Sequence, residues 1–123
     1  MTSALDAFLR AVATGDEAAA ESAAVQLAPA DERVILARLV AAQDDEERWW
    51  MTRALASCGS AAALPALTAC LADDDAAERA TAALALAQIA QRHSGAPVAL
   101  SIIAGLLQDE EGFVRQAAGD ALA

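Results

Sequence analysis

The chain of 123 residues has no lysine and no tyrosine, and aromatic residues make up only 3% of it. It has two cysteines, too few for a disulfide framework, and one histidine, so it offers no evident catalytic constellation. No apolar run reaches the ~20 residues needed to cross a bilayer. The first residues also lack the basic and apolar regions of a secretory signal. We therefore expect a cytoplasmic protein that does not bind membranes.

Basic residues are also scarce. The chain has 18 acidic residues and only 8 arginines, which gives a net charge of −10. Phosphate binding needs a basic surface, so this balance argues against nucleic acid as a partner. What the chain has in quantity is alanine, which supplies 37 residues. Alanine is the strongest helix former and is rare in strands. The composition therefore predicts an all-α fold with closely approaching helices.

Capping residues, glycines and prolines divide the sequence into about eight expected helices. Asp16, Asp31 and Ser60 are typical N-cap residues, and Gly15 and Gly59 are typical helix ends. The expected helices span residues 3–14, 16–28, 32–42, 44–59, 61–72, 73–92, 97–108 and 109–123.

Three of these helices repeat one pattern. An acidic cluster precedes an arginine, and Ala-Leu-Ala follows the arginine, with Arg48, Arg79 and Arg115 separated by 31 and 36 residues. A helix pair that recurs at this period is typical of an α-solenoid. We expect each arginine to form ion pairs with the acidic turn of a neighbouring repeat.

Residues 109–122 (DEEGFVRQAAGDAL) resemble the first helix of a HEAT repeat, and are especially similar to the bacterial type also found in phycobilisome lyases. Residues 54–59 and 63–67 resemble the turn and the second helix of the same family. The resemblance implies an α-solenoid (α-α superhelix) of antiparallel helix pairs. We expect one domain, composed of an N-terminal capping helix (1–15), helix-pair repeats (16–43, 44–73 and 74–108) and a C-terminal half repeat or cap (109–123).

The acidic clusters 44–47, 73–75 and 109–111 fall in equivalent turns. Asp44 with Glu47, and Asp75 with Glu78, have the spacing of a capping box, which predicts helix capping at a solvated edge. The alternatives are a dock for a basic partner or a metal site, although no cluster has the spacing of a calcium loop.

The adjacent tryptophans Trp49 and Trp50 point about 100° apart on a helix. The other repeats hold Ala80 and Gln116 at the position of Trp49, so we expect Trp49 to be the more exposed of the two. Either both rings pack over alanine-rich neighbours, or Trp49 anchors a partner.

Cys58 and Cys70 align with Ile89 and Leu106 of the next repeat, so we expect two reduced, buried thiols. His93 falls in a loop and is expected to be an ordinary loop residue.

These observations favour a non-enzymatic protein-protein interaction scaffold without a cofactor, by itself or as a module of a larger repeat protein. We expect another protein as its partner, and a monomer or a weak homo-oligomer formed through the terminal helices. The resemblance also implies an alternative, a bilin lyase-like subunit, which would need a longer array and a tetrapyrrole pocket. A helical-repeat DNA glycosylase is a third class, which the net charge disfavours.

We expect the second helices of the pairs to line the concave surface. The candidate contact residues are Trp49, Trp50, Arg33, Arg38, Thr68 and Ser101.

Overall fold

The structure is a computed structural model that describes residues 2–93 and 100–123. Over these residues the chain forms eight α-helices, three short 3-10 helices and no strand, which confirms the all-α prediction. The α-helices are α1 (Ala4–Thr14), α2 (Glu17–Ala24), α3 (Glu32–Ala41), α4 (Asp45–Cys58), α5 (Leu64–Cys70), α6 (Ala76–Arg92), α7 (Leu100–Gly105) and α8 (Gly112–Leu122). The 3-10 helices are η1 (Pro29–Asp31), η2 (Ala61–Ala63) and η3 (Leu106–Gln108).

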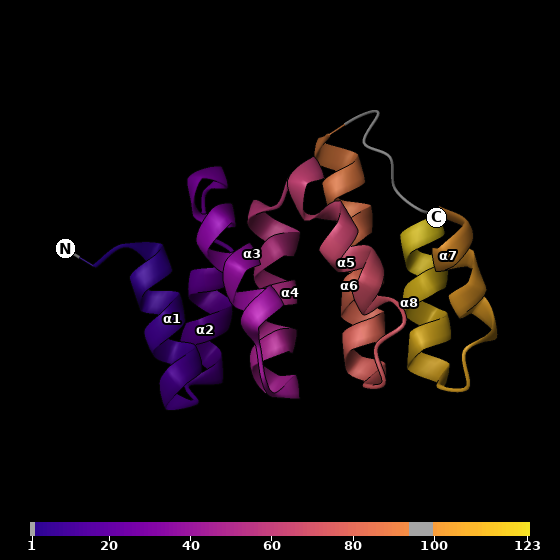
Figure 1. Ribbon diagram of the computed structural model, residues 1–123, viewed down its shortest axis with the longest axis horizontal. Coiled ribbons are helices and arrows are strands. Elements are labelled where there is room, and N and C mark those ends of the chain that lie inside the picture. The colour runs from indigo at the N-terminus through magenta and orange to yellow at the C-terminus, as the bar shows by residue number, and fades with distance from the viewer. Residues whose placement is uncertain (1, 94–99) are drawn as a thin grey trace.

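The helices follow one another in a row, from α1 at one end of the molecule to α7 and α8 at the other (Figure 1). Helix α4 packs on α6, and α6 packs on α8, while α3, α5 and α7 each pack on the helix that follows them. One continuous hydrophobic core, rich in alanine, runs through the whole row. This is the stack of helix pairs that the repeat predicts, because each pair buries its apolar face against its neighbours.

The helix ends follow from local chemistry. The side chains of Ser3, Asp16 and Asp44 accept hydrogen bonds from backbone N–H groups of the first turns of α1, α2 and α4. Gly15 ends α1 in the left-handed region, with φ of 76°. Helix α2 ends four residues before the predicted end, because a turn follows it, in which the backbone N–H groups of Gln26 and Leu27 donate to the carbonyls of Ala23 and Ala24. The predicted start of the seventh helix, at residue 97, lies outside the described residues.

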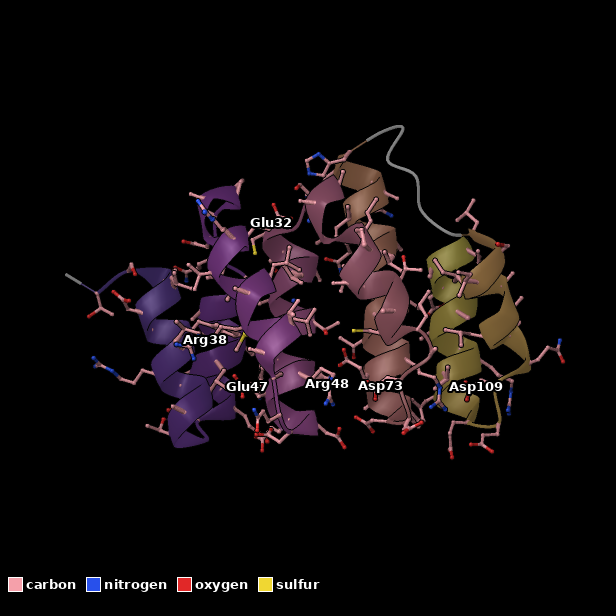
Figure 2. The ribbon with its side chains drawn as sticks, in the orientation of Figure 1. Glu32, Arg38, Glu47, Arg48, Asp73 and Asp109 are labelled. Atoms are coloured by element: carbon pink, nitrogen blue, oxygen red, sulfur yellow. The ribbon has the colours of Figure 1, made fainter. Side chains whose placement is uncertain are left out.

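Arg48 and Arg79 form the predicted ladder along one edge of the molecule, whereas Arg115 forms no ion pair with any residue that the structure describes. Arg79 donates from Nε and Nη2 to both carboxylate oxygens of Asp109 (2.8 and 3.0 Å), and Arg48 Nε lies 3.7 Å from Asp73 Oδ2. Arg48, Asp73 and Asp109 succeed one another along the same edge in Figure 2. The hydrogen bond from Arg79 lowers the pKa of Asp109. The contacts of Arg79 with Asp109 and of Arg48 with Asp73 therefore join one repeat to the next.

The predicted capping box of Asp75 and Glu78 is wrong. Asp75 makes no capping hydrogen bond with its side chain. Glu78 points into the core between α4 and α6, where it is fully buried and accepts a hydrogen bond from the Thr52 hydroxyl (2.5 Å). Burial raises the pKa of Glu78, although the hydrogen bond from Thr52 opposes the shift. Asp44, in contrast, caps α4 as expected, by accepting from the backbone N–H of Glu47 (2.8 Å).

The two cysteines are free and buried, which confirms the prediction for both. Burial raises the pKa of the Cys58 thiol to about 11 and that of the Cys70 thiol to about 12. Next to Cys58, Gly59 lies so close to α6 that an added Cβ would be 2.9 Å from Ile89 Cδ1 and 2.5 Å from the Leu55 carbonyl oxygen. The end of α4 is therefore packed too tightly for any side chain at residue 59.

Candidate functional site

The two tryptophans are held together by aromatic packing. The Trp50 ring lies edge-on to Phe8 of α1, with ring centroids 6.2 Å apart, and Trp49 lies edge-on to Trp50 at 4.8 Å. Trp50 is buried, with 6% exposure, whereas Trp49 is half-buried, which confirms that Trp49 is the more exposed ring. The Trp50 ring therefore fixes the orientation of an indole that still reaches the surface.

Trp49 lies on the wall of an open hollow of about 670 Å³ between α2, α4 and α6. The hollow is lined by carboxylates from all three helices and by small or aromatic side chains. Its lining residues are Glu17, Ala18, Glu21, Asp45, Glu46, Trp49, Trp50, Asp75 and Ala77. No lysine or arginine is among them, so the hollow combines negative charge with an aromatic surface.

Two of the five carboxylates are neutralised by arginines. Glu21 forms an ion pair with Arg53 (2.5 Å), and Asp45 forms one with Arg48 (2.6 Å). The other three, which are Glu17, Glu46 and Asp75, form no ion pair with any residue that the structure describes. The hollow therefore carries an excess of negative charge next to an indole face. Within residues 2–93 and 100–123, no group of three or more His, Cys, Asp or Glu residues is placed to hold a metal ion.

A second hollow, of about 370 Å³, adjoins the first and shares Glu21 and Trp49 with it. Its remaining wall comes from α4 and α6, and includes Arg53, which forms the ion pair with Glu21, and Leu84, whose side chain is exposed. We call the two hollows together the Trp49 groove. It follows the layer of α2, α4 and α6, and Trp49 stands where its acidic part meets its less charged part.

The other predicted contact residues lie elsewhere. Arg33 and Arg38 are exposed on α3, where they line a hollow together with Glu47 and three apolar residues. Figure 2 places Arg38 on α3, facing α1. Thr68 is half-buried on α5 and Ser101 is exposed on α7. None of these four residues lines the Trp49 groove, so the structure does not join Trp49 to the face of α3, α5 and α7.

Sequence reasoning missed the carboxylates of α2, because it read that helix only as the first half of a repeat. A signal was present, since Glu17 and Glu21 are four residues apart and therefore share one helix face. Whether this face lies beside Trp49 depends on how α2 packs against α4. The spacing of residues within α2 does not predict that packing.

A family model for HEAT repeats matches residues 32–123. The matched region contains α3 to α8, which are the helices that carry the repeat and the arginine ladder. The chain therefore belongs to the HEAT-repeat family. The finer likeness to the phycobilisome lyase type stays a prediction, because the matched family is that of HEAT repeats in general. Comparison with proteins of curated function and with solved structures finds no match. None of the described helices has the length and apolar character needed to span a membrane.

Proposed function

We propose that this protein is a non-enzymatic interaction scaffold of the cytoplasm that captures a basic segment of another protein in the Trp49 groove. The observation that carries the proposal is the position of Trp49, a preoriented indole on the wall of a hollow bordered by five carboxylates. An arginine or lysine side chain that enters this hollow meets an aromatic face and negative charge together.

Charge supports the choice of a basic partner. The chain has a net charge of −10, and three of the groove's carboxylates lack an ion pair among the described residues. Complementary charge of this kind accelerates encounter and excludes acidic competitors. Cation–π contact with the indole adds about 0.5–2 kcal/mol, depending on how far the cation is desolvated.

The chemistry of the remaining groups supports binding rather than catalysis. His93 is exposed at the end of α6 and lies outside the groove. Burial raises the pKa of both thiols well above neutral pH, which leaves little thiolate to act as a nucleophile. Two reduced thiols are also typical of a cytoplasmic protein.

The test is a titration of the full chain with a fluorescein-labelled hexa-arginine peptide at moderate ionic strength, followed by fluorescence anisotropy. Trp49→Gln removes the indole without changing the net charge, and glutamine already stands at the matching position of α8, Gln116. We expect it to weaken binding about tenfold, which corresponds to ~1.4 kcal/mol.

The matched control is Phe113→Gln, which removes an aromatic side chain that is 53% exposed on α8 and lies outside the groove. A second comparison uses two double variants. The first, Glu17→Gln with Glu46→Gln, removes two carboxylates of the groove. The second, Glu110→Gln with Glu111→Gln, changes the net charge by the same amount outside the groove. The proposal fails if Trp49→Gln binds as the Phe113→Gln control does, or if both carboxylate pairs have the same effect.

A further inference from the structure

The two hollows of the Trp49 groove differ in charge. The first is bordered by five carboxylates, of which Glu17, Glu46 and Asp75 form no ion pair with any described residue. The second has one carboxylate, Glu21, and Arg53 neutralises it within the same hollow. The rest of the second wall is uncharged, and comprises Trp49, Ala56, Thr81, Leu84, Ala85 and Gln88. The groove therefore has an acidic part and a neutral part.

Leu84 gives the neutral part an apolar contact surface. Its side chain is 38% exposed, although it lies in the middle of α6, eight residues from either end. The repeats place Arg53 and Asp120, two charged residues, at the matching positions of α4 and α8. A leucine at this position therefore departs from the repeat, as Trp49 does on α4. Because both departures line one groove, they indicate a surface that binds apolar groups.

The acidic and neutral parts lie two helical turns apart. Along α6, Ala77 lines the acidic part and Leu84, seven residues later, lines the neutral part. Along α4, Glu46 and Arg53 line the same two parts at the same spacing. Both helices therefore run from the acidic part to the neutral part. Seven residues of α-helix correspond to a separation of about 10 Å along the axis.

This spacing suits a helix better than an extended segment. Residues two turns apart on a helix share one face and are separated by the same distance of about 10 Å. Residues that share a face of an extended segment are separated by about 7 or about 13 Å. The walls of the groove are also side chains of three helices, which present no backbone edge to pair with an extended segment. A helix satisfies its own backbone hydrogen bonds.

We propose that the partner of the Trp49 groove is an amphipathic helix that carries an arginine and a leucine two turns apart on one face. The guanidinium enters the acidic part, where it stacks on Trp49 and meets the carboxylates that lack an ion pair. The leucine packs on Leu84 in the neutral part. This inference rests on the proposed function, to which it adds the conformation of the bound segment and an apolar anchor at a fixed distance from the cation.

A second copy of this chain is the poorer occupant. Its α3 carries Arg33 and Val40 seven residues apart, and both are exposed. However, α3 packs on both α4 and α5, so it cannot enter a groove as a free helix does. Two chains that each carry a net charge of −10 also repel one another.

The test compares two peptides of equal composition. The in-register peptide is a fluorescein-labelled, alanine-based helix of about 16 residues, with an arginine and a leucine seven positions apart. In the out-of-register peptide the leucine is moved by two positions, to the opposite face. Circular dichroism checks that both are equally helical, and fluorescence anisotropy follows their titration with the full chain. We expect the in-register peptide to bind about fivefold more tightly, because its leucine is buried on binding.

Leu84→Gln tests the neutral part of the groove. We expect it to weaken binding of the in-register peptide about fivefold. It should change binding of the out-of-register peptide and of hexa-arginine by less than about twofold, because neither places a leucine on residue 84. The matched control is Leu122→Gln, which removes a leucine that is 37% exposed on α8 and lies outside the groove.

The outcomes separate this proposal from the one on which it rests. If Trp49→Gln weakens binding of hexa-arginine but the two helical peptides bind equally, this proposal is overturned and the proposed function stands. The same holds if Leu84→Gln acts as the Leu122→Gln control does. If Trp49→Gln leaves the binding of every peptide unchanged, both proposals fail.

Sedimentation of the full chain tests the occupant, which we expect to be a different protein. Self-association that Leu84→Gln abolishes would instead make a second copy the occupant and overturn that part.

Discussion

Glu78 makes the stability of this protein depend on pH in a direction opposite to that of most carboxylates. It is fully buried between α4 and α6, and its Oε2 accepts from Thr52 while its Oε1 has no hydrogen-bond partner among the described residues. Burial disfavours the charged form and raises its pKa above the ordinary value of 4.5. The perturbation we choose is Glu78→Gln, which keeps the shape of the protonated acid but cannot ionise.

The magnitude follows from linkage between proton binding and folding. Below pH 4.5 the carboxyl is protonated in both the folded and the unfolded chain, so its contribution to stability is fully present. Above that pH the unfolded chain releases the proton while the folded chain keeps it. The wild type then loses about 1.4 kcal/mol of unfolding free energy per pH unit relative to the variant, until the pH passes the raised pKa of the folded state.

The assay is urea unfolding followed by far-ultraviolet circular dichroism, at pH values between about 4.5 and 8. The unfolding free energy of Glu78→Gln minus that of the wild type should grow with pH and then level off. Glu47→Gln, at the matching and half-exposed position of the preceding repeat, controls for the change in net charge. A difference that stays constant with pH, or that shrinks as pH rises, would refute the buried acid as the cause.

Three further predictions concern packing and burial. Gly59→Ala should destabilise the protein by about 1–3 kcal/mol in urea unfolding, because its Cβ would collide with Ile89 and with the carbonyl of Leu55. Gly119→Ala should instead stabilise it by about 0.5–1 kcal/mol, since nothing lies within 4 Å and alanine favours the helix; a loss equal to that of Gly59→Ala would contradict the packing argument. Cys58 and Cys70 should react with Ellman's reagent in the native protein far more slowly than after unfolding, and equal rates would contradict their burial.

The sequence by itself predicted the helices, the repeat and the ladder, because these depend on local or periodic signals. Alanine content and capping residues predict where helices begin and end: the described ends of the other α-helices lie within three residues of their predicted positions, and α2 ends four residues early. The repeat was enough to predict that the arginines pair with acidic turns of neighbouring repeats, as Arg79 does with Asp109, since equivalent positions of stacked repeats face one another.

Tertiary structure alone decided the roles of Glu78 and Trp49. Glu78 has the spacing of a capping residue, and at the matching position of the preceding repeat Glu47 remains half-exposed. Glu78 is buried where α6 packs on α4, and there Thr52, a residue distant in sequence, donates a hydrogen bond to its carboxyl. Trp49 likewise acquires three of its five neighbouring carboxylates from α2 and from the N-cap of α6. Burial and local charge depend on which helices pack together, and helical periodicity specifies the face of a residue but not the neighbour that covers it.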